Sequence, residues 1–590
     1  DKEFIHAEIG ECLEKLYEPN ADEIAAQLAI HFYRGHILDK VVSYCLKAAQ
    51  DANARYGAAE ALHFVKMGLQ ALESRIKVLP QQEYAETKVQ LLLELARSEK
   101  NGGDPQEKKD HIQEGINYLE SSLSLLYNLS DKFYAEIYSE LGKLYDRKGL
   151  KYSKKVKEYL EKALYVYEKQ NNKRNVAEIL YHLAGADVYP NILSAPGEKN
   201  PEEKCIDVLR KAILIAEQMQ DIDLQIKCTI RLSAHMKRKD FRYAEKGVLR
   251  ALELWENFGK SDKSFEVLIE MAYICRQGYA RHKTGIKYLN QALEFAKRTG
   301  DVGLESWILY VVGASFGFYT TLQRKAQITM EEALLIREKT GIRKYLMLSR
   351  IGNIFLRQGQ WKNAEEYIQK AINESRWERY NLWQLYLFQE NYPQAEKELL
   401  HKLEQREKYK RFPNILIYTG LALNYALLGK EEQSQKYLEH AYSLLEQKTI
   451  PIEKSEALYI IAETQRLLEN FESSKIACQQ ALSWFLTNAE DPEELISVAE
   501  VRLTMGKILV DMADYQEAIT YLDKAKAAFE ICGHYALGET LLYLGKAHLG
   551  LGGVIFQRQA QEYLNQALAE FQRLELRHKE QEAKEVLKAL

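Results

Sequence analysis

A small residue, almost always alanine, returns about every 40 residues along this chain, a spacing within the range of repeat proteins. It ends a repeated phrase that begins with an aromatic or aliphatic residue and leucine, as in YLEKAL (159–164) and YLNQAL (288–293). Residues three and four apart share one face of an α-helix, so the phrase places its leucine and alanine on the same side of a helix. The recurring alanines are Ala163, Ala212, Ala251, Ala292, Ala333, Ala371, Ala441, Ala481, Ala525 and Ala567.

The spacing of these alanines is regular over most of the chain. The exception is the step from Ala371 to Ala441, which is almost twice as long as the others. That step divides into two when Lys402 takes the missing place. A fixed period of about 20–50 residues is typical of proteins built from stacked supersecondary units. The repeat therefore predicts one continuous solenoid rather than the roughly four domains that length alone suggests.

A second helical phrase precedes each of these anchors. It is clearest in IGNIFLRQGQWKNAEEYIQKA (351–371) and MGKILVDMADYQEAITYLDKA (505–525), where glycine stands beside a large apolar residue. The small residue lets the second helix approach closely, and a glycine after the first helix provides a left-handed C-cap. The layout predicts an all-α fold, a superhelix of about 13 antiparallel helix pairs.

This layout resembles the tetratricopeptide repeat (TPR), whose usual period, about 34 residues, is shorter. The longer period here predicts longer helices or turns. The resemblance implies a scaffold without catalytic activity, whose concave surface binds a protein or peptide. Four residues occupy the equivalent inner position just after the small residue, and we predict that they contact the partner: Lys143, Asn353, Lys507 and Lys546.

The N-terminal part differs from the regular repeats. We predict a helical segment at 1–75, followed by a continuous superhelix at 76–590 with loop insertions near 100–110 and 185–203. Residues 5–73, with the helical phrases AAQLAIHF, SYCLKAAQDA and AAEALHFVKMGLQAL, resemble the segment that follows the nucleotide-binding and winged-helix parts of STAND-type signal-transduction ATPases. The absence of an initial methionine agrees with a piece of a longer protein.

Two functions are consistent with these resemblances. The first is the partner-sensing arm of a signal-transduction ATPase, a transcription regulator or an immune-type sensor of phage proteins, which would self-associate through its parent protein. The second is a free-standing TPR adaptor that binds peptides or protein termini. An adaptor of that kind would carry basic and amide side chains on consecutive inner helices. The four inner residues are not consecutive, which favours the sensing arm.

An aromatic segment, RWERYNLWQLYLFQENY (376–392), coincides with the shortest interval between repeats. Its rings could fill the core at an irregular joint. Aromatic residues are also frequent in protein interfaces, because a rigid amphipathic ring covers a large area at little entropic cost. We predict that four of them contribute to the partner surface: Trp377, Tyr380, Trp383 and Tyr386.

The charge and cysteine patterns argue against several classes of protein. With 81 basic and 85 acidic residues, the net charge of −4 disfavours a dedicated nucleic-acid binder. Two basic runs, 147–157 and 236–246, fall at repeat turns, where solvated side chains or contact with an acidic protein surface are the simpler interpretations. No apolar run reaches about 18 residues, so we expect no membrane span. Seven scattered cysteines suggest a reducing, cytoplasmic environment rather than disulfides or a zinc site.

Catalytic motifs are absent from the sequence as well. Gly-Lys-Ser at 259–261 ends like a nucleotide-binding P-loop, but Leu254 stands where that motif requires glycine, and a predicted helix precedes it in place of a strand. No HExxH motif occurs, and no nucleophile elbow or Ser/His/Asp set stands on a predicted strand scaffold. We therefore predict no catalytic residue, cofactor-binding residue or metal ligand in this chain. Any ATPase activity would belong to other parts of a parent protein.

Overall fold

The computed structural model describes residues 2–54, 57–75, 79–100, 111–123, 125, 131–148, 152–188, 201–237, 239–260, 264–299, 302–340, 344–374, 382–408, 414–446 and 450–590. Within these ranges the chain consists of α-helices joined by turns and short 3₁₀-helices, with one isolated β-bridge and no named strand. The all-α prediction is confirmed.

The helices alternate between two layers. The odd-numbered helices are α1 (Lys2–Leu16), α3 (Leu38–Ala54), α5 (Gln81–Lys100), α7 (Asp131–Lys148), α9 (Lys173–Val188), α11 (Ile222–Met236), α13 (Glu266–Tyr279), α15 (Val302–Phe316), α17 (Tyr345–Arg357), α19 (Leu382–Phe388), α21 (Ile415–Leu427), α23 (Pro451–Leu467), α25 (Ile496–Asp511), α27 (Leu537–Leu551) and α29 (Arg577–Lys588). The even-numbered helices are α2 (Ala25–Arg34), α4 (Ala58–Ser74), α6 (His111–Leu123), α8 (Ser153–Lys169), α10 (Pro201–Gln218), α12 (Phe241–Asn257), α14 (His282–Thr299), α16 (Gln323–Thr340), α18 (Trp361–Glu374), α20 (Tyr392–Lys408), α22 (Glu431–Glu446), α24 (Phe471–Asn488), α26 (Tyr515–Cys532) and α28 (Val554–Arg573).

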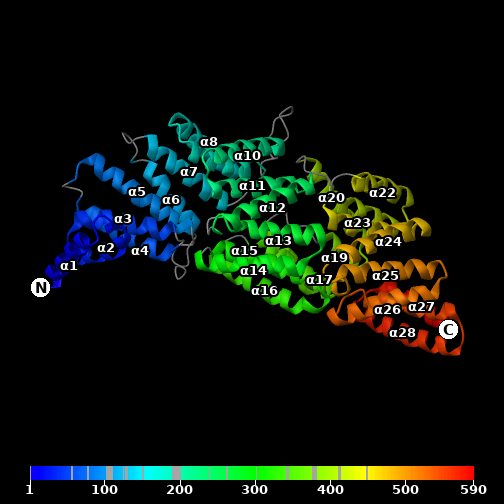
Figure 1. Ribbon diagram of the computed structural model, residues 1–590. Coiled ribbons are helices and arrows are strands. Elements are labelled where there is room, and N and C mark those ends of the chain that lie inside the picture. The colour runs from blue at the N-terminus through cyan, green and yellow to red at the C-terminus, as the bar shows by residue number, and fades with distance from the viewer. Residues whose placement is uncertain are drawn as a thin grey trace.

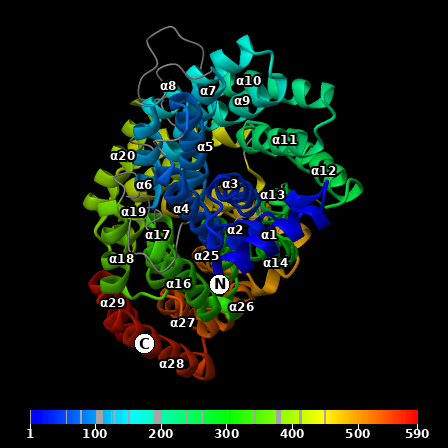
Figure 2. The same cartoon turned by 90° about the vertical axis from the view of Figure 1, so that its left-hand side faces the viewer.

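Thirteen antiparallel helix pairs, from α3/α4 to α27/α28, follow one another across the described residues, in agreement with the predicted number. Figure 1 shows them stacked from the N-terminus at one end of the superhelix to the C-terminus at the other. Odd-numbered helices contact their odd-numbered neighbours from α3 to α13 and from α21 to α29, and they form the inner layer. In the end view, even-numbered helices such as α10, α12 and α28 lie at the outside of the superhelix (Figure 2).

The two predicted interruptions fall mainly outside the described residues. Residues 101–110 and 189–200 belong to neither a described helix nor a described turn. Helix α9 continues to Val188 and α10 begins at Pro201, and the predicted insertions stay predictions. Helices α3 and α4 pack against α5 in the manner of later pairs, and a boundary at residue 75 stays a prediction.

Small residues bring the two helices of a pair together. All ten recurring alanines are completely buried. A Cβ atom on Gly142 would lie 2.5 Å from Cδ2 of Leu160, and one on Gly545 would lie 2.6 Å from Cγ of Leu564. No side chain fits at such distances without displacing the facing helix. The repeated pattern of small and large residues therefore reflects where the two helices of a pair cross and pack closely.

The superhelix also contacts itself from one turn to the next. Helix α13 packs against α23, ten helices later in the chain. The 3₁₀-helix η3 (Thr320–Leu322) contacts α26, and Tyr319 forms an antiparallel bridge with Leu495, next to the hydrogen bond from Ile496 N to Phe318 O. We call this region, where residues 265–392 meet residues 450–578, the turn contact.

Aromatic rings extend the turn contact toward the C-terminus. Trp361 donates a hydrogen bond from Nε1 to the carbonyl oxygen of Leu574 at 2.9 Å. The ring of Tyr535 stacks on Phe388, with 4.4 Å between the ring centroids, and its backbone N–H donates to the carbonyl oxygen of Arg357. The inner side of the C-terminal repeats is therefore covered by the preceding turn of the same chain.

A carboxyl group lies within this covered region. Burial raises the pKa of Glu456, on α23, to about 7, and the opposite charge of Arg357 only partly compensates for it. Burial also raises the pKa of Glu500, on α25. At neutral pH the turn contact therefore holds carboxyl groups whose ionised form is disfavoured by their surroundings.

We expect Glu456→Gln to stabilise the protein above pH 7 and to have little effect near pH 4.5. The folded pKa exceeds the unfolded value, so the favourable contribution of protonated Glu456 is complete below about pH 4.5 and is lost as the pH rises through 7. Because the Glu456 side chain is partly accessible, the substitution should raise the free energy of unfolding at pH 8 by about 1–2 kcal/mol. Urea unfolding at pH 4.5 and pH 8 measures the difference, with exposed Glu472→Gln as control. Equal destabilisation at both pH values would contradict the assignment.

Candidate functional site

The equivalent inner lysines join successive odd-numbered helices. Lys143 lies on α7, Lys507 on α25 and Lys546 on α27. Each Nζ atom lies within 2.8 Å of a carboxylate oxygen on the next odd-numbered helix; the partners are, in the same order, Glu178, Glu539 and Glu582. The fourth predicted residue, Asn353, is half-buried on α17. The position singled out in the sequence therefore serves to connect repeats through ion pairs.

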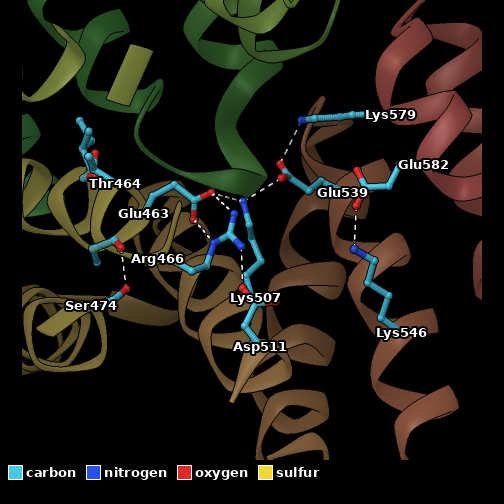
Figure 3. A network of polar contacts seen from close by, with 12 residues as sticks. Glu463, Thr464, Arg466, Ser474, Lys507, Asp511, Glu539, Lys546, Lys579 and Glu582 are labelled. Atoms are coloured by element: carbon cyan, nitrogen blue, oxygen red, sulfur yellow. Dashed lines mark hydrogen bonds and ion pairs between the residues drawn. The ribbon is translucent and has the colours of Figure 1, made fainter. Parts of the chain in front are cut away.

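At the C-terminal end these pairs form what we call the closed network: Glu463, Arg466, Lys507, Asp511, Glu539 and Lys579 (Figure 3). Lys507 Nζ lies 2.5 Å from Glu463 Oε1 and 2.7 Å from Glu539 Oε1. Arg466 bonds Glu463 and Asp511, and Lys579 reaches Glu539. Three carboxylates thus face three cations, and the network is balanced in charge.

The centre of the closed network is buried, whereas Asp511 and Lys579 at its edges are 26% and 25% exposed. The side chain of Lys507 is 6% exposed, and the preceding turn covers this side of the repeats. Burial alone would raise the pKa of Glu463, but Arg466 and Lys507 hold it at about 2. A buried ion pair must be complete, because an isolated buried charge is strongly destabilising. The closed network therefore holds α23, α25, α27 and α29 together through ion pairs.

A second group of inner charges, near the N-terminus, lines a cavity of about 500 Å³. We call it the open pocket. Its walls come from α5, α7, α8 and α9, and they are formed by Arg97, Glu136, Ser139, Glu140, Lys143, Tyr167, Asn175, Glu178 and Ile179.

Ion pairs hold the floor of the open pocket. Lys143 Nζ lies 3.1 Å from Glu140 Oε1 and 2.8 Å from Glu178 Oε1. Arg97 pairs with Glu94 on its own helix and approaches Glu140 at 3.8 Å. The attraction of Lys143 outweighs burial and lowers the pKa of Glu178 to about 2, so this carboxylate is ionised at neutral pH.

The remaining carboxylate of the pocket has a weaker partner. Glu136 Oε2 lies 3.9 Å from Arg97 Nη2, beyond hydrogen-bond distance, and its side chain is 27% exposed. Glu178 is 36% exposed. With the buried Glu94, four carboxylates surround the two cations Arg97 and Lys143. The open pocket therefore carries an excess of negative charge, unlike the closed network.

The predicted aromatic residues are only partly described. Trp377 and Tyr380 lie outside the described residues. Trp383 is 8% exposed on α19 and packs in a core with Leu399, close to Gly420. Tyr386 is half-buried on the same helix. That these residues and the four inner ones bind a partner stays a prediction.

The acidic side of the open pocket was missed in the sequence, although a signal exists. Glu136 stands seven residues before Lys143, which is two helical turns along one face. Glu500 precedes Lys507, and Glu539 precedes Lys546, by the same interval. A glutamate seven residues before the inner lysine thus marks three of the inner helices.

Searches for other kinds of site give negative results within the described ranges. No group of three or more histidine, cysteine, aspartate or glutamate side chains there could hold a metal ion. In the same part of the chain, no helix is both long and apolar enough to cross a bilayer. Gly259, from the incomplete P-loop, has a φ of +91° and directly follows the end of α12, as a C-cap glycine does.

Comparison with known proteins identifies one repeat. The family described as "Tetratricopeptide repeat" matches residues 499–529, which span most of the pair α25/α26. No curated protein matches the chain in sequence. The observed superhelix of helix pairs and this match together support a TPR-type solenoid.

Several solved structures have a related outline. The APC/C hetero-tetramer Cut9–Hcn1 is 15% identical, with a TM-score of 0.49, covering 92% of this chain and 96% of that one. A Rap protein complexed with competence and sporulation factor is 13% identical, with a TM-score of 0.34, covering 76% and 99%. A tetratricopeptide repeat protein from Parabacteroides merdae is 16% identical, with a TM-score of 0.31, covering 48% and 98%. At these values the likeness carries no inference about function.

Proposed function

We propose that this chain is a protein-binding scaffold without catalytic activity, and that its partner enters the inner surface at the open pocket. The single observation that carries the proposal is the cavity of about 500 Å³ formed jointly by α5, α7, α8 and α9. A site built from three consecutive repeats can bind an extended segment of a partner, because each repeat contributes contacts along the bound segment.

The contrast with the closed network supports this location. Lys143 and Lys507 occupy equivalent positions and each pairs with two carboxylates, but the side chain of Lys507 is 6% exposed, whereas that of Lys143 is 15% exposed and lines a cavity. The preceding turn already covers the C-terminal inner surface, as the bond between Tyr535 and Arg357 demonstrates. We therefore place the partner at α5–α9. We also propose Trp377, Tyr380 and Tyr386 as a second contact region.

Site-specific photo-crosslinking in cells that make the protein tests this proposal. A photoreactive phenylalanine replaces half-buried Asn175 in the pocket or, as the matched control, Tyr165, which is 71% exposed on α8. We expect a discrete adduct with a second protein from position 175 and none from position 165. Adducts formed equally at both positions, or only at position 165, would contradict a partner in the pocket.

A narrower proposal concerns the protein to which the scaffold belongs. The likeness of residues 5–73 to STAND-type ATPases supports a cytoplasmic sensing arm that assembles through a parent protein, and the three phrases behind it lie on α2, α3 and α4. A free-standing adaptor is the alternative. The reading frame upstream of Asp1 decides between them: a nucleotide-binding loop supports the arm, and a start codon close by supports the adaptor.

A further inference from the structure

We infer that the open pocket recognises a lysine or arginine side chain on an extended segment of the partner protein. This inference rests on the proposed function and specifies the chemistry of the partner. The occupant is a cationic side chain, because the carboxylates outnumber the cations among the described residues that line the cavity.

The closed network and the open pocket differ in the balance between carboxylates and cations. The closed network contains three carboxylates and three cations around Lys507, whose side chain is 6% exposed. The open pocket is lined by Arg97 and Lys143 against Glu136, Glu140 and Glu178, and Arg97 also pairs with Glu94, which does not line the cavity. The charges of the described residues therefore balance in the closed network, whereas acidic residues outnumber basic ones at the open pocket. One or two cationic groups from a partner would complete it.

The geometry of the cavity suits a long cationic side chain. Glu136 and Glu178 project from α7 and α9, and both line the cavity with partly exposed carboxylates. Their existing partners leave lone pairs available, since each carboxylate can accept several hydrogen bonds. Tyr167, which is almost completely buried, also lines the cavity. A guanidinium or ammonium group therefore finds carboxylate oxygens on two neighbouring inner helices.

Other partner chemistries fit this cavity less well. An acidic segment would bring like charges against Glu136 and Glu178, and this repulsion is strong in a partly desolvated site. A nucleic-acid backbone would meet the same repulsion, because its phosphates require an excess of basic side chains. An apolar side chain would leave the carboxylates without a new partner as their water is displaced.

Peptide binding by the full chain tests the inference. The probes are fluorescent Gly/Ser decapeptides that carry three arginines, three citrullines or three glutamates, titrated by anisotropy. We expect the arginine peptide to bind and the other two not to bind. Glu136→Gln/Glu178→Gln should weaken arginine-peptide binding by about tenfold or more, as expected for loss of charged hydrogen bonds. The matched control Glu158→Gln/Glu161→Gln removes two exposed carboxylates from α8 and should not change it.

Two further measurements keep the result interpretable. Glu136→Gln alone removes only the carboxylate with the 3.9 Å contact, so the fold should survive, and binding should still weaken. Glu136→Lys should gain affinity for the glutamate peptide. Equal binding of arginine and citrulline peptides, or an unchanged affinity in both Gln variants, would overturn the inference. If crosslinking at position 175 persists in that case, the scaffold function stands and only the cationic specificity fails.

Discussion

Replacing Lys507 by methionine should lower the free energy of unfolding of the C-terminal repeats by about 3–5 kcal/mol, because one cation is removed from a buried charge network. Methionine preserves most of the side-chain volume, so the loss arises from charge rather than from a cavity. Glu463 and Glu539 would each lose a bond of 2.7 Å or less. Denaturant unfolding followed by circular dichroism measures the effect.

The matched control for this substitution is Lys162→Met. Lys162 Nζ lies 2.6 Å from Glu158, but the lysine is 47% exposed on α8. An exposed pair of this kind contributes about 0.3–0.5 kcal/mol, so the control should be nearly neutral. Comparable losses in the two variants would contradict a special role of burial. The triple variant Glu463→Gln/Lys507→Met/Glu539→Gln should recover part of the loss, because it also removes the two carboxylate charges that the single substitution leaves without Lys507. Lys579 then loses its bond to Glu539, but its side chain is 25% exposed.

The same substitution has a defined dependence on pH. In the wild-type chain the folded pKa of Glu463 is about 2, below its unfolded value. Its contribution to stability is therefore present above about pH 4.5 and is lost as the pH falls toward 2. The difference between wild type and Lys507→Met should accordingly shrink between pH 7 and pH 3. A difference that is constant over this range would exclude an electrostatic origin.

Removing two aromatic rings from the turn contact should open the superhelix. In Trp361→Ala/Tyr535→Ala, the hydrogen bond to Leu574 and the stacking on Phe388 are both lost. Truncation of a large buried aromatic side chain costs about 3–5 kcal/mol, and partly buried rings should cost at least half of that each. Because these contacts join segments from successive turns, their loss should separate the turns as well as destabilise each repeat.

Small-angle X-ray scattering measures the opening. We expect a larger radius of gyration for the double variant and unchanged helix content by circular dichroism. Tyr165→Ala, which removes a ring that is 71% exposed, should alter neither quantity. A scattering curve identical to that of the wild type would mean that the turn contact does not determine the pitch of the superhelix.

Much of the local architecture can be deduced from the sequence. The regularly recurring alanines are all buried, and Gly142, Gly506 and Gly545 lie where a facing leucine leaves no room for a side chain. These contacts join helices that are adjacent in the chain, so a local pattern records them. The inner lysines follow from the same pattern, since Lys143, Lys507 and Lys546 each reach the next odd-numbered helix.

The sequence could not distinguish the open pocket from the closed network. Lys143 and Lys507 stand in the same phrase after the same small residue, and only the surroundings differ. Trp383 illustrates the same limit: its spacing suits either a surface or a core, and packing against Leu399 places it in the core.

What the sequence determined by itself is therefore the helix pair, its repetition and the inner position of each lysine, because these depend on contacts within one repeat or between neighbouring repeats. Only the tertiary structure decided which inner surface is covered. The crossing angles of successive pairs accumulate until α23 meets α13, and Trp361 meets Leu574 in a much later repeat. The contact between these distant repeats depends on small angular differences at many joints. The sequence of a single repeat therefore does not predict it.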